Sequence, residues 1–163
     1  MVRVKINLLS KLGAIAAILL LASCDNLFHQ YCAVGGCWVS SDTLTFTYSA
    51  REGEERLLCN FDIEVRSNSD YRYKELFLRV ERISKLQRDT VVDTLLCELF
   101  DDKGYRKGSA AGILQQTGFT VDTLEVLPDD TLTIKISHLM DDECLQGVSD
   151  VGVRLSRCGR HQF

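Results

Sequence analysis

Cysteine is the residue type in this sequence whose spacing points most directly to chemistry. One of the seven cysteines, Cys24, follows Leu21-Ala-Ser, which is typical of a lipobox: the small residues fit the lipoprotein signal peptidase, and the thiol of Cys24 is the nucleophile that takes the diacylglycerol. Residues 1–11 carry three basic side chains, and residues 12–22 form an apolar run too short to span a bilayer. The pattern predicts a signal peptide over residues 1–23. The alternative is an ordinary secretory signal that happens to end near a cysteine.

The predicted lipid on Cys24 would be the protein's contact with a membrane. Each buried methylene contributes about 0.8 kcal/mol, so two or three acyl chains, palmitate among them, would hold the protein without a transmembrane helix. We expect a membrane-anchored lipoprotein of the cell envelope, at the outer membrane and facing the periplasm.

The other six cysteines would meet oxidising conditions in an exported chain, and six cysteines allow fifteen pairings. Cys32 and Cys37 bracket a short flexible loop that could close, and Cys144 and Cys158 flank the C-terminal region, so these four are candidates for disulfides. Cys59 and Cys97 lie in strand-like runs, where a disulfide and two buried thiols are equally compatible with the sequence. No Cys-x-x-Cys pair or neighbouring histidine offers the spacing of a zinc site.

Residues that could act in catalysis or bind ions are scattered. One cluster combines a histidine with carboxylates, and a solvated acidic turn is the better interpretation of it than a calcium site, because the ordered ligand spacing of a calcium loop is missing. The cluster contains His138, Asp141, Asp142 and Glu143. Without a nucleophile elbow or a phosphate-binding glycine loop, we expect no enzyme, no metal, no cofactor and no nucleotide ligand.

Three aromatic residues are candidates for contact with a partner. Trp38 lies beside the possible Cys32–Cys37 loop, and Tyr71 and Tyr73 follow a turn-rich segment. Aromatic side chains are enriched at interface hot spots, although they could equally cap one end of a hydrophobic core. The second interpretation is favoured for Trp38.

Length and charge limit the classes of protein further. A chain of 163 residues favours one domain. Removing residues 1–23 takes away three of the 19 Lys and Arg and none of the 23 Asp and Glu, so the net charge changes from −4 to −7. A body this acidic excludes nucleic acid as an expected partner.

Alternation of apolar and polar residues dominates the chain after residue 40 and predicts short strands. Leu57, Cys59, Phe61, Ile63 and Val65 share one predicted face. The pattern favours an all-β antiparallel β-sandwich, jelly-roll or immunoglobulin-like, of about seven or eight strands. We expect a lipidated tether and leading loop over residues 24–41 and the sandwich domain over residues 42–163. Residues 104–120 are expected to be a long connection, and residues 138–147 to hold one short helical turn.

Six groups of short motifs follow Cys24 in a fixed order. They are Phe28-His-Gln-Tyr31; Gly36-Cys-Trp38; Asp42-Thr-Leu-Thr-Phe46; Asn68-Ser-Asp-Tyr-Arg-Tyr73 followed by Leu76-Phe-Leu78; Asp93-Thr-Leu95 with Gly104, Gly108 and Gly112; and Gly147-Val-Ser-Asp-Val-Gly-Val-Arg154. In this order they resemble the GldH family of gliding-motility lipoproteins of Bacteroidetes, over nearly the whole mature chain.

The resemblance implies a lipoprotein associated with the gliding machinery and the linked type IX secretion system, in a family with no known catalytic activity. We expect a non-enzymatic structural or accessory component whose partners are other envelope proteins. The alternative is a β-sandwich lipoprotein that binds glycans or proteins at the surface, with aromatic side chains as a platform.

Overall fold

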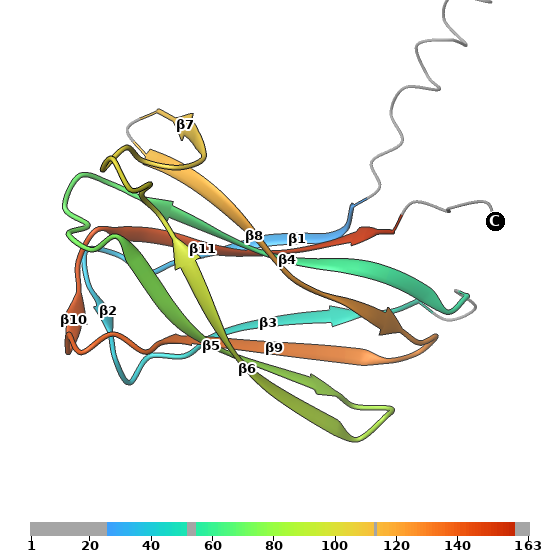
Figure 1. Ribbon diagram of the computed structural model, residues 1–163. Helices are drawn as coiled ribbons and strands as arrows, with labels where there is room; N and C mark the ends of the chain where they lie inside the picture. The colour runs from blue at the N-terminus through green and yellow to red at the C-terminus, as the bar shows by residue number, and fades with distance from the viewer. Residues whose placement is uncertain (1–25, 52–54, 113, 159–163) are drawn as a thin grey trace, which may run out of the picture.

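The computed structural model describes residues 26–51, 55–112 and 114–158, and the regular elements in these ranges are all β-strands (Figure 1). A five-stranded sheet has the order β1-β11-β4-β8-β7, and a four-stranded sheet has the order β3-β9-β5-β6. These sheets form the two layers of a sandwich, and the ribbon of β2 and β10 lies at one end (Figure 1). The strands are β1 (Asn26–Ala33), β2 (Trp38–Val39), β3 (Leu44–Ser49), β4 (Leu57–Ser67), β5 (Glu75–Ser84), β6 (Asp89–Glu98), β7 (Ser109–Ala111), β8 (Leu114–Val126), β9 (Thr131–His138), β10 (Cys144–Leu145) and β11 (Val148–Arg157).

The predicted all-β antiparallel sandwich is confirmed. Apart from three strands of two or three residues, the described part of the chain contains eight strands, as expected. The predicted tether over residues 24–41 is wrong, because β1 is an edge strand of the five-stranded sheet and β2 pairs with β10. Residues 104–120, expected to be a connection, contain β7 and the first half of β8, and the stretch expected to hold a helical turn contains β10.

The core lies between the sheets and follows the predicted alternation. Every second residue of β4 points inward, and Cys59, Phe61, Ile63 and Val65 are fully buried. Facing them from the four-stranded sheet are Leu76, Leu78, Val80, Ile134 and Ile136, all at most 1% exposed. Burying one such side chain contributes about 1.5–3 kcal/mol, so this double layer accounts for the stability of the domain.

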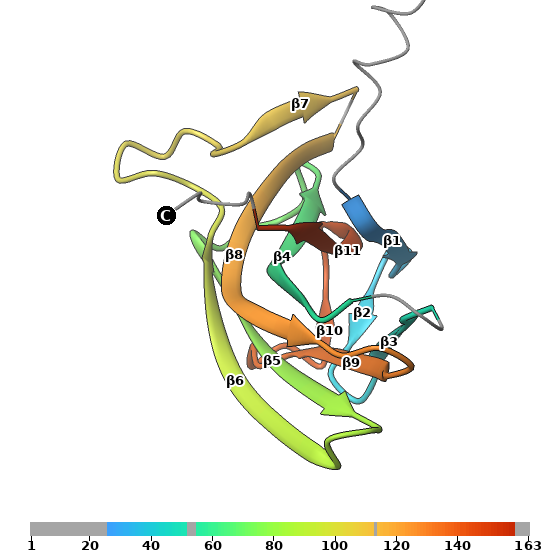
Figure 2. The same ribbon diagram turned by 90° about the vertical axis from the view of Figure 1, so that its right-hand side faces the viewer.

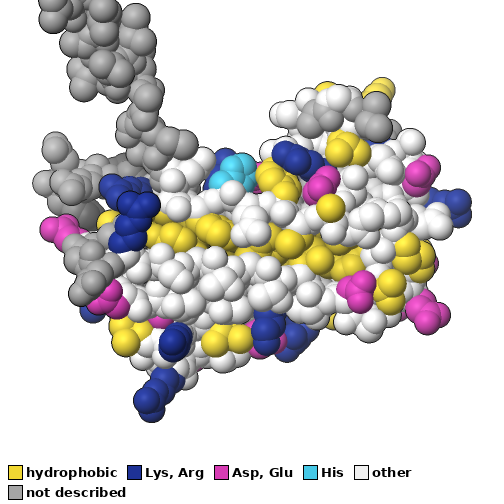
Figure 3. Space-filling view, turned by 180° about the vertical axis from the view of Figure 1, so that it is seen from behind, with side chains coloured by type: hydrophobic (Ala, Val, Ile, Leu, Met, Phe, Trp, Pro, Cys, Tyr) yellow, Lys and Arg dark blue, Asp and Glu magenta, His cyan; other side chains and the backbone are white. Residues whose placement is uncertain are grey.

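Partly buried side chains continue the core towards one border of the sandwich, where β1 and β3 are the edge strands. Figure 3 shows an apolar band running between the two sheets on this side. Phe28 of β1 and Tyr48 of β3 meet there edge to face, with ring centroids 5.9 Å apart. The band is therefore the flank of the core, closed by contacts between the two edge strands.

Gly147 makes the tight turn that leads into β11. Its φ is +85°, and a Cβ placed on it would lie 2.0 Å from the backbone nitrogen of Tyr71. Asn68 donates a backbone hydrogen bond of 2.9 Å to its carbonyl oxygen, so the turn is fixed against the loop after β4. Only glycine fits both the left-handed conformation and this approach.

Replacing Gly147 by alanine is expected to lower the free energy of unfolding by at least about 3 kcal/mol, because backbone strain and a clash with the main chain act together. Urea denaturation would measure the change. Gly104 is a matched control, since its φ is +81° but a Cβ there would meet nothing within 4 Å. Gly104→Ala should cost only about 1 kcal/mol. Equal losses in the two variants would contradict the predicted clash.

Candidate functional site

The outer face of the five-stranded sheet carries a network of polar side chains from four neighbouring strands. In one cross-strand row, Tyr31 of β1 lies opposite Gly152 of β11, which lies opposite Glu64 of β4. The next row joins His29, Arg154 and Asp62 in the same way. We call this network the Glu64 cluster, and its members are His29, Tyr31, Asp62, Glu64, Arg66, Gln116, Thr120 and Arg154.

Glu64 is the centre of the cluster and is only 3% exposed although it lies on the outer face. Its carboxylate accepts a short hydrogen bond from the Tyr31 hydroxyl and lies 3.0 Å from His29 Nε2 and 3.3 Å from Gln116 Nε2. Burial raises the pKa of this carboxyl, but the hydrogen bonds from Tyr31 and His29 and the charge of Arg154 outweigh burial, and the pKa is lowered from 4.5. Glu64 is therefore held as a carboxylate.

Tyr31 lies flat over the sheet because Gly152 leaves room for it. A Cβ on Gly152 would lie 2.6 Å from a ring carbon of Tyr31. The Arg66 guanidinium covers the ring at 3.6 Å from its centroid, and Arg66 Nε donates to Gln116 at 3.1 Å. Burial and the neighbouring Glu64 carboxylate raise the pKa of Tyr31 to about 12, so its hydroxyl stays protonated as a donor.

Asp62 forms a second centre beside Glu64. Its Oδ2 accepts hydrogen bonds from Nε and Nη2 of Arg154 at 3.2 and 3.1 Å, and its Oδ1 accepts one from Thr120 at 2.8 Å. Nη1 of Arg154 lies 3.5 Å from Glu64, so one guanidinium serves both carboxylates. This charge-assisted pairing joins β11, β4 and β8 across the outer face.

Among the described residues, the hydrogen-bond and ion-pair partners of Glu64 and Asp62 come from within the cluster, so the cluster holds neighbouring strands together. Tyr31 and His29 bring β1 into contact with the central strand β4, although β11 separates the two strands in the sheet. The sequence contained a signal for this cluster, since Asp62, Glu64 and Arg66 alternate with the apolar residues of β4. What it lacked was the pairing register that brings His29 and Tyr31 to them.

Replacing Glu64 by glutamine is expected to lower the free energy of unfolding at pH 7 by about 1–2 kcal/mol. Hydrogen bonds to a charged group contribute more than neutral ones, but His29 and Arg154 are more than a third exposed and solvent screens them. Because the folded-state pKa of Glu64 lies below 4.5, the carboxylate's contribution is complete above pH 4.5 and is lost as the pH falls through the folded pKa.

Denaturation of both proteins between pH 3 and pH 7 would check this linkage. The wild type and Glu64→Gln should converge in stability as the solution becomes acidic. Glu55→Gln, at an exposed position outside the cluster, is the control and should change little at any pH. A gap between wild type and Glu64→Gln that stays constant down to the lowest pH would contradict the assigned charge.

Two of the four candidate cysteines form a disulfide in the structure, and the other two do not. Cys37 and Cys144 form a disulfide with a Cα–Cα distance of 5.2 Å, whereas Cys32 and Cys158 remain thiols. The Cys32–Cys37 loop therefore does not close on itself, because Cys32 belongs to β1 and pairs with Val151 of β11.

Cys59 and Cys97 are buried thiols and do not form a disulfide with each other, which decides between the two alternatives that the sequence left open. Burial raises the pKa of Cys97 to about 12. Cys24 and the predicted signal peptide lie outside the described residues.

Two of the three aromatic candidates for partner contact are buried. Trp38 is 1% exposed and donates its indole N–H to the Asp42 carbonyl oxygen at 3.3 Å. Tyr71 is 3% exposed and donates its hydroxyl to the Glu75 carbonyl oxygen at 2.8 Å. Both residues close the end of the core, which is the interpretation favoured for Trp38, and the possible partner contact is left to Tyr73, which is 42% exposed. A shared aromatic platform for glycans is therefore not formed.

His138 is part of this same closed end. It is 4% exposed, its Nε2 lies 3.1 Å from the Trp38 carbonyl oxygen, and its Nδ1 accepts from the backbone nitrogen of Met140. Both of these contacts are with backbone groups. Within the described ranges, no group of three or more His, Cys, Asp or Glu side chains is arranged to hold a metal ion. In the same ranges no helix is long and apolar enough to cross a bilayer.

Comparison with models of protein families gives a match over most of the chain. The family model described as GldH lipoprotein matches residues 26–155, from the first residue of β1 to near the end of β11. The match covers both sheets and all members of the Glu64 cluster. No curated protein matches the chain.

Proposed function

This chain belongs to the GldH lipoprotein family, and from that premise we propose that it is a non-enzymatic accessory component of the envelope assembly for gliding and the linked type IX secretion. Membrane anchoring in the cell envelope follows from the family. Its place at the outer membrane, on the periplasmic face, and its association with other envelope proteins are parts of the proposal.

The observation that carries the proposal is the position of β1. This strand begins at Asn26, two residues after the predicted acylation site, and the Glu64 cluster fastens it to the centre of the sheet. A lipid on Cys24 would thus hold the sandwich directly at the membrane. Such an arrangement suits a component that presents a fixed surface to neighbouring proteins at a set height above the bilayer.

A non-enzymatic role is supported by the contacts of the residues that could otherwise act in catalysis. His138 is enclosed by backbone groups, His29 is engaged by Glu64, and the buried Cys97 thiol is far from its reactive, ionised form at neutral pH. Each of these side chains is explained by its part in holding the fold together.

Crosslinking in living cells tests the proposal. The full-length lipoprotein, tagged at its C-terminus and expressed at its native level, would be captured after crosslinking and its partners identified by mass spectrometry. We expect proteins of the gliding and secretion machinery to co-purify, and deletion of the gene to impair secretion and the display of surface proteins. If no envelope partner is captured and both processes are intact in the deletion strain, the proposal fails.

A further inference from the structure

We propose that the border of the sandwich between β6 and β8 binds an extended, basic segment of a partner protein, which pairs with the edge of β6 and places a Lys or Arg side chain in the adjoining cavity. This inference rests on the proposed function, since it names the surface through which the chain would bind an envelope partner.

The edge of β6 is long and unpaired in the described residues, and its first half carries the acidic residues Asp89 and Asp93. The strand pairs with β5 along ten positions, and in the part of the chain that the structure describes it has no neighbour on its other side (Figure 2). Val91, Val92 and Leu96 are 39%, 50% and 44% exposed along it. Exposed apolar edge strands invite pairing with another strand, and proteins usually cover or charge them.

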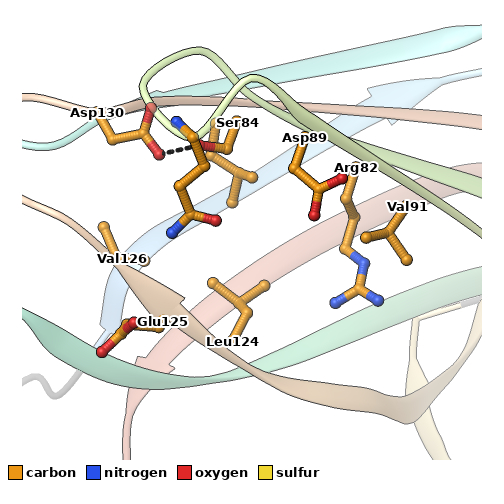
Figure 4. A pocket seen from close by; sticks show the side chains of 10 residues that line it. Arg82, Ser84, Asp89, Val91, Leu124, Glu125, Val126 and Asp130 are labelled. Atoms are coloured by element: carbon orange, nitrogen blue, oxygen red, sulfur yellow. Dashed lines mark hydrogen bonds between the residues drawn. The ribbon is translucent and has the colours of Figure 1, made fainter.

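A cavity of about 190 Å³ opens beside the first half of β6, between the two sheets (Figure 4). Its apolar walls are Val91, Leu124, Val126 and Leu132, which come from both layers. Cavities for drug-sized ligands start at about 300 Å³, so this one suits a single long side chain better than a small-molecule ligand. Inward-facing side chains of a strand added to β6 would point towards it, because successive side chains alternate between the faces of a sheet.

The charge around this cavity favours a cation. Arg82 spans the gap between the sheets, with Nη2 2.7 Å from Asp93 of β6 and Nη1 3.2 Å from Asp122 of β8. Arg56 pairs with Glu125 at 3.0 Å. Among the side chains that line the cavity, Asp89, Glu125 and Asp130 are acidic and Arg82 is basic, whereas Lys85 and Arg88 lie in the exposed turn beside it. A Lys or Arg with an apolar stem fits both the walls and the excess negative charge.

Two polar groups beside the cavity are already engaged or buried. The Asp130 carboxylate is already engaged by Ser84 Oγ and by the backbone nitrogens of Leu86 and Thr131. Arg82 Nε is buried and has no hydrogen-bond acceptor among the described residues. That nitrogen is out of reach of a docked segment, and the engaged Asp130 carboxylate is not free to hold a metal ion.

A second copy of this chain is a poorer occupant than a basic partner. Antiparallel pairing of two β6 edges would bring two acidic borders together, and like charges at an interface oppose association. The opposite border of the sandwich is also a poorer site, because Phe28 and Tyr48 close it. The observations therefore favour a basic segment at β6.

The test uses the purified mature protein and two synthetic peptides. The first alternates threonine and valine with one central lysine, and the second carries glutamate in place of the lysine. Fluorescence anisotropy would measure binding, and amide hydrogen exchange would locate it. We expect the lysine peptide to bind at least tenfold more tightly and to slow exchange in β6.

Charge-reversed variants make the test specific. Asp89→Lys should weaken binding of the lysine peptide at least fivefold and improve binding of the glutamate peptide, whereas Asp141→Lys, at the other end of the sandwich, should do neither. Equal affinity for the two peptides, protection of β1 or β3 instead of β6, or concentration-dependent protection of β6 without peptide would each overturn the inference. These outcomes leave the crosslinking result untouched, so failure of this surface and failure of the proposed function can be distinguished.

Discussion

Replacing Cys24 by alanine, behind a secretory signal peptide that is cleaved without a lipobox, is expected to move the protein completely from the membrane fraction to the soluble fraction of the periplasm. One acyl chain of about 14 carbons gives only reversible membrane binding, with a partition constant on the order of 10⁴ M⁻¹, and two or more chains give stable anchoring. The thiol of Cys24 is the predicted attachment point for those chains. Its loss removes the whole contribution at once, which makes this the largest effect expected of any single substitution in the chain.

Fractionation of cells expressing each protein, with a carbonate wash of the membranes and metabolic labelling with palmitate, would measure the effect. Cys158→Ala is the control, because it removes a thiol but leaves the lipobox intact, and it should stay in the membrane fraction and keep the label. The purified Cys24→Ala protein should unfold at the wild-type urea concentration, since the described fold begins at residue 26. A Cys24→Ala protein that remains in carbonate-washed membranes after its signal peptide has been removed would show that the lipid is not the anchor.

The strands that the sequence predicted best are those with aliphatic side chains at every second position. In β4 and β9 every inward position of the predicted alternation holds an apolar residue. Leu132, Ile134 and Ile136 of β9 are an example, and all three lie in the core. In β1, Phe28 and Cys32 pack against the core, Gln30 between them is exposed, and His29 and Tyr31 belong to the polar cluster on the other face. That mixture carries little hydrophobic contrast, so β1 resembled a linker until its pairing with β11 was known.

Pairings between distant residues were harder to predict for a different reason. Six cysteines can pair in fifteen ways, and the sequence is compatible with all of them. Which cysteines form a disulfide depends on which strand ends meet in space. Cys37 and Cys144 meet because β2 and β10 pair, and this pairing also buries Trp38 and Leu145. The Glu64 cluster depends in the same way on the register of four strands. The alternation of apolar and polar residues within each strand thus predicted the two sheets of the sandwich. The disulfide and the Glu64 cluster could not be predicted, because they depend on which distant strands pair and in what register.

Breaking the Cys37–Cys144 disulfide should have the largest effect on the stability of the folded domain. The bond closes a loop with a sequence separation of 107 residues. In the chain-entropy model a loop of this length restricts the unfolded chain by about 5 kcal/mol, and native disulfides contribute about 2–5 kcal/mol in practice. The ribbon that it crosslinks contains only two residue pairs, Cys144 with Val39 and Leu145 with Trp38. A ribbon so short cannot hold itself together in water.

We therefore expect Cys37→Ser to lower the free energy of unfolding by about 3–5 kcal/mol, and Cys37→Ser/Cys144→Ser to cost nearly the same, because the bond is already lost in the single variant. Urea denaturation followed by the fluorescence of Trp38, the single tryptophan of the chain, would measure both. Cys32→Ser is the matched control and should keep most of the stability, since Cys32 is a partly buried thiol.

The reductant dithiothreitol should lower the urea midpoint of the wild type to that of the Cys37→Ser variants and should leave the midpoints of those variants unchanged. If the wild-type midpoint did not respond to reductant, the ribbon would be stabilised by the packing of Trp38 and Leu145, and the bond would be dispensable.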